Sequence, residues 1–126
     1  MNSLETARRK ARRAIESLYQ GKCTIFEYQS VKDPVTKITE QKEIAVISNQ
    51  PCRLSFKTMN STSQNDGAAI VTQSVTLFIA ADVNIKPGSK ITVTQNGITN
   101  DYQNSGKPAV YTNHQEIILE IFRGWA

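Results

Sequence analysis

The sequence has little material for catalysis or metal binding. Its 126 residues include one histidine and two cysteines, and they contain neither a G-x-G-x-x-G run nor a Walker-type G-K-[ST] signature. The single histidine, His114, lies in a polar stretch that predicts a loop, and no motif ties a serine or cysteine to it. We therefore expect a protein that is not an enzyme and that uses no metal and no cofactor.

Long apolar runs are also missing. No stretch approaches the roughly 20 apolar residues that a membrane-spanning helix needs. The first residues, MNSLETARRKARRAIESLYQ, carry arginine and lysine where a secretory signal has an apolar segment. We expect no contact with a membrane and a chain that is made in a cytoplasm. In a reducing compartment Cys23 and Cys52 are expected to be small core residues rather than a disulfide.

Positive charge is concentrated at the N-terminus. From residue 21 onward ten basic and nine acidic side chains nearly cancel, whereas five basic residues occupy six earlier positions: Arg8, Arg9, Lys10, Arg12 and Arg13. Leu4, Ala7, Ala11, Ile15 and Leu18 recur at helical spacing between an N-cap at Asn2 or Ser3 and a stop at Gly21. Residues 1–20 are therefore predicted to form a basic amphipathic helix. Its cations either form a solvated face or contact phosphates or an acidic protein patch.

The pattern after Gly21 is that of β-structure. Strands are predicted in KCTIFEYQ, KEIAVIS, CRLSFKT, AAIVTQSVTLFIAAD and QEIILEIFRGW, with turns at Asp33-Pro34 and at NQP, residues 49–51. Pro87-Gly88 predicts a tight turn, and Asn96-Gly97 predicts a two-residue hairpin in which Gln95 pairs with Ile98. About seven strands with short turns predict a mainly β fold, a small antiparallel β-barrel or sandwich over residues 21–126 with one N-terminal basic helix.

One long segment has no apolar period and is predicted to be a polar loop. It consists of Met59, Asn60, Ser61, Thr62, Ser63, Gln64, Asn65, Asp66 and Gly67. Loops of this length in a compact domain tend to be functional or mobile. Two interpretations stay open: a simple connector, or a flexible segment that refolds against copies of itself in a ring.

The order of these elements resembles that of the head-closure, or head-completion, proteins at the neck of tailed bacteriophages, in the form found in prophages of Gram-positive bacteria. The resemblance is carried by GKCTIFEYQ, NQPCRLSF, DVNIKPGSKITV and SGKPAVYTNHQEIILEIF, which cover most of the chain from Gly21 to Phe122. In both, a turn with glycine leads into a strand, a hairpin that ends in an aromatic residue (here Tyr102), a loop and an apolar last strand. Ser89 departs from the pattern, because an acidic residue often follows the glycine. The basic helix is not a general feature of the family.

The resemblance implies a structural protein of the virion neck. Such proteins are small β-barrels that form a ring below the portal and its adaptor, help to retain packaged double-stranded DNA, and present a surface to the tail. The implied partners are further copies of the chain in a ring of six or twelve, the phage adaptor or portal ring, tail-terminator or tail-tube proteins, and the DNA in the channel. The particle would be assembled in the cytoplasm of a bacterial host. The family does not set a role for the basic residues; our own hypothesis is that they dock on the adaptor ring or line the DNA path, and that residues 59–67 form a lumen loop.

Two other functions fit the same sequence. A tail terminator or another small tail or neck protein has a similar β-rich build, and only its position in the particle distinguishes it. A monomeric β-barrel that binds nucleic acid through the basic helix is the second alternative. Salt-dependent binding of a stable monomer to DNA would favour it.

Overall fold

The computed structural model describes residues 2–62 and 69–125 of the chain. One helix and seven strands follow one another in the order α1 (Ser3–Glu16), β1 (Gly21–Lys32), β2 (Thr39–Thr62), β3 (Ala69–Ile79), β4 (Lys90–Gln95), β5 (Ile98–Asn104), β6 (Ala109–Val110) and β7 (Gln115–Ile121). Their antiparallel pairings give one sheet in the order β3-β2-β1-β4-β5-β7-β6, and β3 also pairs with β7, so the sheet closes into a barrel. The predicted mainly β fold with one N-terminal helix is confirmed.

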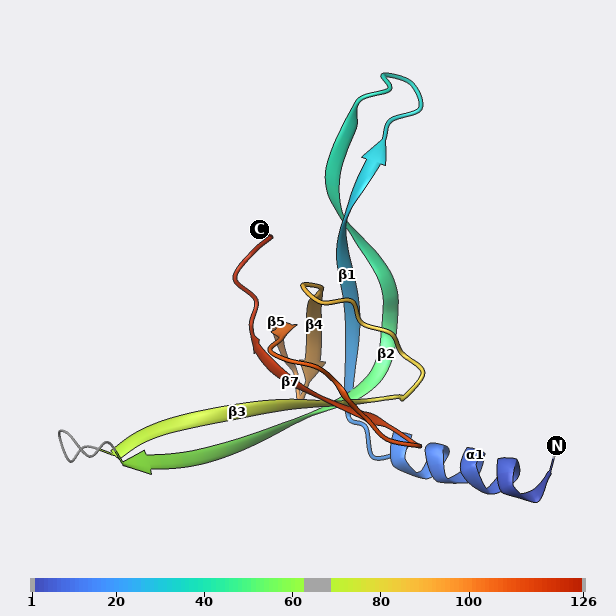
Figure 1. Cartoon of the computed structure of the whole chain (residues 1–126), viewed down its shortest axis with the longest axis vertical. Coiled ribbons are helices and arrows are strands. Elements are labelled where there is room, and N and C mark those ends of the chain that lie inside the picture. The colour runs from blue at the N-terminus through green and yellow to red at the C-terminus, as the bar shows by residue number, and fades with distance from the viewer. Residues whose placement is uncertain (1, 63–68, 126) are drawn as a thin grey trace.

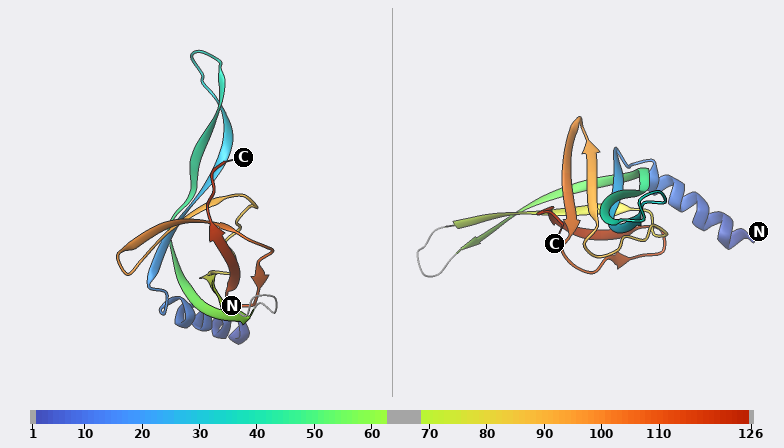
Figure 2. Two further views of the ribbon diagram at one scale, coloured as in Figure 1. Left: turned by 90° about the vertical axis from the view of Figure 1, so that its left-hand side faces the viewer. Right: turned by 90° about the horizontal axis from the view of Figure 1, so that it is seen from above.

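The barrel is small relative to what extends from it. Figure 1 shows α1, the β1–β2 hairpin and the β2–β3 hairpin leaving a common centre in different directions. The two further views in Figure 2 show the same three extensions, together with the shorter β4–β5 hairpin. Within the described ranges, no helix is long and apolar enough to cross a membrane.

The core is built from the inward-facing residues of the barrel strands. Buried side chains come from β1, β2, β3, β4, β5 and β7, and one from the loop before β4: Cys23, Ile25, Cys52, Leu54, Leu77, Ile79, Ile85, Ile91, Val93, Tyr102, Ile117 and Leu119. The alternation along each strand places these residues on one face of the sheet, as the period of two requires. Both predicted core cysteines are in this set and both are free thiols.

The β4–β5 hairpin follows the prediction from Asn96-Gly97. Gln95 pairs with Ile98, and the register continues to Ile91 opposite Tyr102. Asn96 and Gly97 have φ values of 54° and 76°, which is the geometry that a two-residue hairpin with matching strand twist requires. Gly88 has a φ of 84°, so the predicted Pro87-Gly88 turn is confirmed as well.

The predicted reversal at NQP is wrong, because β2 is continuous from Thr39 to Thr62. The strand pairs with β1 up to Cys52 and with β3 from Cys52 onward. A register shift against β1 lies between the Cys23 and Ile25 pairs, and Asn49, in the facing part of β2, has a φ of 53°. An asparagine in this conformation allows a bulge that bends a strand without reversing it. One bent strand therefore serves two parts of the barrel.

The prediction of a loop over residues 59–67 is wrong for its first four residues, because these also belong to β2. Met59, Asn60, Ser61 and Thr62 belong to β2 and pair with residues 69–72 of β3. Strand pairing is made by backbone groups, so a polar sequence without apolar alternation is compatible with a two-stranded ribbon. Ser63, Gln64, Asn65, Asp66 and Gly67 lie outside the described residues, and their assignment as a loop stays a prediction.

The helix is shorter than the predicted residues 1–20. Asn2 is the N-cap, with its Oδ1 accepting a hydrogen bond of 2.8 Å from the Glu5 amide, but α1 ends at Glu16 with Ser17 as C-cap. Gly21 is not the helix stop. It is the buried first residue of β1, where a Cβ would lie 3.1 Å from the carbonyl oxygen of Cys52. The glycine is therefore explained by close strand packing.

One end of the barrel is completed by a side chain. β1 begins at Gly21, opposite Cys52, so Leu54 of β2 lies beyond the first residue of β1 and has no partner in that strand. The Leu54 amide donates to Gln95 Oε1 at 2.8 Å, and Gln95 Nε2 donates to the Leu54 carbonyl oxygen at 3.2 Å. The primary amide thus takes the place of a missing β1 residue, which satisfies backbone groups that would otherwise lack partners.

Candidate functional site

The β1–β2 hairpin extends well beyond the barrel. β4 pairs with β1 only from Lys22 to Phe26, so residues 27–44 pair with nothing but each other (Figure 1). We call these residues the β1–β2 arm. A two-stranded hairpin is marginally stable in water by itself. The arm therefore needs support from the rest of the chain or from a partner.

The tip of the arm is an ordered turn with exposed apolar side chains. The Asp33 carboxylate accepts hydrogen bonds from the amides of Val35 at 2.8 Å and Thr36 at 3.3 Å, and Lys37 closes the turn with a φ of 60°. Val35 is 87% exposed and Ile38 is 59% exposed. A shaped apolar tip at the end of an extended hairpin is suited to docking on another surface.

The Asp33 turn gives a pH prediction. Hydrogen bonds from the amides of Val35 and Thr36 lower the pKa of the Asp33 carboxyl below its ordinary value. A lowered folded-state pKa means that the stabilisation is present above the unfolded pKa and is lost as pH falls through the folded pKa. We expect NMR titration of the Asp33 carboxyl to give a midpoint below 3.8, with the Val35 and Thr36 amide shifts following it. A midpoint at or above 3.8 would contradict this, and Asp33→Asn should abolish the amide titration.

The base of the arm is held by the C-terminal residues 122–125, which we call the C-terminal strap. Trp125 stacks on Tyr28 with ring centroids 5.1 Å apart, and Phe122 meets Trp125 edge-on at 5.0 Å. Trp125 Nε1 also donates to Glu43 Oε1 at 3.3 Å, so the strap contacts both strands of the arm. As large apolar groups near the chain end, Phe122 and Trp125 are expected from the sequence to close the core, with docking into a neighbour as the alternative. They instead brace the arm from outside the core.

A lysine continues this cluster onto the barrel. Lys90 Nζ forms an ion pair with Glu43 and lies 4.7 Å from the centroid of the Phe26 ring and 5.8 Å from that of Phe122. Its side chain is 16% exposed, which strengthens both cation–π contacts relative to a fully solvated cation. The arm, the strap and β4 are thereby joined at one place.

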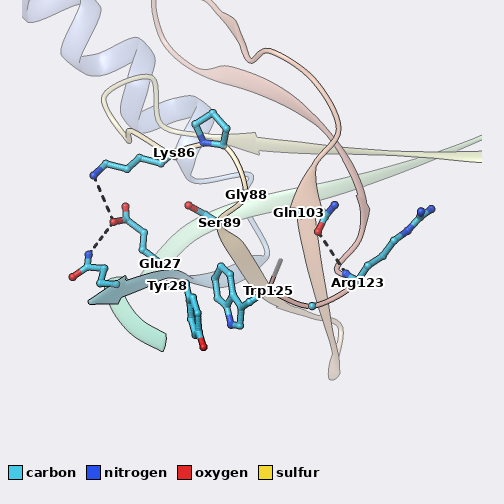
Figure 3. Close-up of a pocket in the computed structure, with 11 residues that line it drawn as sticks. Glu27, Tyr28, Lys86, Gly88, Ser89, Gln103, Arg123 and Trp125 are labelled. Carbon is cyan, nitrogen blue, oxygen red and sulfur yellow. Dashed lines mark hydrogen bonds and ion pairs between the residues drawn. The ribbon is translucent and has the colours of Figure 1, made fainter. Parts of the chain in front are cut away.

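An open cleft of about 630 Å³ lies between the arm base, the loop before β4 and the strap. Figure 3 shows Lys86 and Glu27 joined on one wall and the stacked Tyr28 and Trp125 on another. Gln29 Nε2 also donates to Glu27 Oε1 at 3.0 Å. Lys86 Nζ is 3.7 Å from Glu27 Oε1, so the loop before β4 is tied to the arm. None of the residues that line the cleft is a histidine or cysteine. The cleft arranges polar groups but holds no nucleophile paired with a base.

The predicted basic residues lie on a helix that stands away from the barrel. No residue of α1 is buried within the described part of the chain, and Leu4 and Leu18 are 57% and 65% exposed. One hydrogen bond joins the middle of the helix to the barrel, from Arg12 Nη2 to the carbonyl oxygen of Thr112 at 3.4 Å. The apolar stripe predicted from the sequence is therefore only partly covered, because Ala11 and Ile15 are half-buried while Leu4, Ala7 and Leu18, which lies beyond the end of α1, are exposed.

The loop that contains Thr112, the hydrogen-bond acceptor of Arg12, also contributes to a row of stacked side chains. No sequence motif indicated this row. Tyr111 stacks on His114 with centroids 4.9 Å apart, His114 stacks on Phe78 at 6.0 Å, and the Arg53 guanidinium lies 5.5 Å from the Phe78 ring. His114 Nε2 is also 3.3 Å from Glu116 Oε2. His114 is half-buried, so its interpretation as an exposed loop residue is corrected. No local sequence pattern could predict the contact of His114 with Phe78, because the two residues are 36 positions apart in the chain.

The two sites predicted from the sequence are not brought together. Both Figure 1 and Figure 2 show α1 and the β2–β3 hairpin pointing to opposite sides of the barrel. The basic residues and the end of β2 at Met59–Thr62 cannot form one site on a single chain. Their separation is compatible with contacts to two different neighbours.

The described residues offer little for chemistry of other kinds. Across 2–62 and 69–125, no cluster of three or more His, Cys, Asp or Glu side chains could hold a metal ion. Cys23 and Cys52 are 1% and 0% exposed, and the hydrogen bond with Cys52 together with burial raises the pKa of the Cys23 thiol. A buried neutral thiol is a poor nucleophile.

Comparison with known proteins gives a likeness in structure but none in sequence. No protein-family model matches the sequence, and no curated protein matches it. The chain is similar to a solved structure, the phage-like element PBSX protein xkdH from Bacillus subtilis, at 12% identity and a TM-score of 0.46. The likeness covers 78% of this chain and 90% of that one.

Proposed function

We propose that this chain is a structural subunit of the head–tail connector of a tailed bacteriophage. It is a head-closure subunit that forms a ring below the portal or adaptor, closes the DNA-filled head and offers a surface to the tail. The resemblance of residues 21–122 to head-closure proteins supports this role. So does the geometry, which is independent of that resemblance.

The observation that carries the proposal is that three extended elements leave one small barrel and find few partners on their own chain. α1 has no buried residue, the β1–β2 arm pairs only with itself, and β2 and β3 continue as a ribbon past Phe56 opposite Val75. Short helices and two-stranded hairpins are marginally stable alone. Neighbouring subunits would complete all three, which is the arrangement expected of a ring subunit.

The internal bracing fits the same role. A contact element is effective when it is ordered before it binds, because less conformational entropy is lost on binding. The stack of Trp125 on Tyr28 and the Lys90–Glu43 ion pair hold the base of the arm, and the Asp33 turn shapes its tip. We propose that the tip side chains Val35 and Ile38 dock on an adjacent subunit or ring. The lumen role of the segment that begins at Met59 remains part of the same proposal.

The test is immunogold electron microscopy of particles from the producing strain, with antibody to this chain. We expect label at the collar between head and tail. Label along the tail or at its tip would favour a tail protein instead. Absence of the chain from purified particles would overturn the structural role.

A variant in which residues 30–41 are replaced by a short turn should still fold but should give filled heads without tails.

A further inference from the structure

We infer that α1 binds the phosphate backbone of double-stranded DNA through Arg8, Arg9, Lys10, Arg12 and Arg13. The inference deepens the proposed function, because it gives the DNA in the channel a named contact. It is tested on the purified chain in solution, so its failure leaves the position of the chain in the particle untouched. The argument rests on the charge, exposure and attachment of the helix.

The cations form two adjoining rows along the helix. Arg8 and Arg12 are four residues apart, as are Arg9 and Arg13, so each pair lies on one line of the helix surface. All four side chains are exposed. α1 has 14 residues and is therefore about 21 Å long, long enough to follow several phosphates of a duplex.

Among residues 2–62 and 69–125, no ion pair neutralises the positive charge of α1. α1 contains two acidic residues, Glu5 and Glu16, near its two ends. None of the salt bridges found among the described residues includes a cation of α1. Exposed cations without acidic partners keep their counterions, and release of these counterions drives binding to a polyanion.

The helix is attached where the barrel adds further positive charge. Arg12 contacts the carbonyl oxygen of Thr112, beside the stacked Tyr111 and His114. That row of rings ends at Arg53, which is exposed on β2. Arg53 therefore adds one exposed cation near the attachment of α1, beside the Glu116 carboxylate that lies against His114, and DNA that follows the helix would also meet Arg53.

Two other occupants of this surface fit less well. A second copy of α1 packed along the first would bring two sets of five cations together, which like-charge repulsion opposes. A membrane surface would be bound through the apolar stripe, but alanine supplies Ala7, Ala11 and Ala14 of that stripe and large apolar side chains are few. Charge complementarity therefore favours a nucleic-acid backbone.

The experiment measures binding of the full chain to a 30-base-pair duplex of arbitrary sequence by fluorescence anisotropy at several salt concentrations. If about four phosphates are neutralised, the logarithm of the binding constant should fall with the logarithm of salt concentration with a slope of about −4. Replacement of Arg8, Arg9, Arg12 and Arg13 by glutamine should weaken binding about 100-fold at low salt and reduce the slope by about 3 to 4. Thermal stability should hardly change, because these side chains are exposed.

A matched variant removes the same net charge elsewhere. Lys32, Lys37, Lys57 and Lys107 are exposed and lie outside α1, and their replacement by glutamine should leave at least half of the binding free energy. Equal loss in both variants would show a non-specific effect of net charge and would overturn the inference. Undiminished binding by the arginine variant would overturn it too. So would stronger binding to vesicles of phosphatidylglycerol than to the duplex, since this indicates a membrane surface.

Discussion

Gln115→Met is expected to lower the free energy of unfolding by about 2 kcal/mol, because it removes two hydrogen bonds and takes away the donor to the Val83 carbonyl oxygen, while the Ala80 carbonyl keeps the Val83 amide as a donor. Gln115 is 3% exposed at the start of β7. Its Nε2 donates to the carbonyl oxygens of Ala80 at 2.9 Å and of Val83. Methionine has a similar length and fills the same space, so the loss reports the hydrogen bonds and not a cavity.

The effect should extend beyond stability, because the loop that Gln115 holds is tied to the arm. This loop places Ile85 in the core, and its Lys86 pairs with Glu27 at the arm base. Urea unfolding followed by circular dichroism measures the change in free energy. Gln41→Met is a suitable control, since Gln41 is exposed on the arm and its loss should cost less than about 0.5 kcal/mol. Equal stability of the two variants would refute the role given to Gln115.

Trp125→Ala is expected to free the base of the β1–β2 arm. The substitution removes the stack on Tyr28, the edge contact with Phe122 and the hydrogen bond to Glu43. Loss of an aromatic pair with its burial and hydrogen bond amounts to about 2 kcal/mol of local stability, which corresponds to roughly 30-fold faster amide exchange. Hydrogen–deuterium exchange of peptides from residues 27–44 measures this directly.

The expected change is local, which gives the measurement an internal reference. Peptides from β4 and β5 should exchange at the same rate in Trp125→Ala and in the unaltered chain, because the strap is not part of the core. Trp125→Phe should retain most of the protection, since it keeps a ring against Tyr28. Ile98→Ala, at an exposed position of another hairpin, should leave the arm unchanged. Undisturbed exchange in the arm of Trp125→Ala would show that the strap does not support it.

Local sequence signals predicted the features that depend on neighbouring residues. Asn96-Gly97 specified its hairpin and register, because these two residues adopt positive φ at low cost. Asn2 predicted the start of α1 by the same kind of local hydrogen bonding. The alternation in this hairpin predicts one face with Ile91, Val93, Ile98 and Tyr102; three of them lie in the core, but Ile98, at the end of the hairpin, is 64% exposed.

The errors arose where a residue's role is set by a distant segment. Asn49 and Pro51 are residue types that favour a turn. β2 nevertheless runs on through them, because it pairs with β1 up to Cys52 and with β3 from Cys52 onward, so they form a bend within one strand. Gly21 follows the predicted helix as a stop signal would, but the structure needs glycine there because the Cys52 carbonyl oxygen leaves no room for a side chain. Polar residues from Met59 to Thr62 became strand because β3 supplies their backbone partners.

The sequence by itself determined a mainly β chain with a basic N-terminal helix, because charge clusters, apolar alternation and turn residues act over a few positions. Closure of β3 on β7, the brace of Trp125 on Tyr28 and the stack of His114 on Phe78 were decided only by the tertiary structure. Each of these joins residues that are far apart in the chain. Their energies come from burial and ring contacts that exist only after the barrel has formed, so no local pattern encodes them.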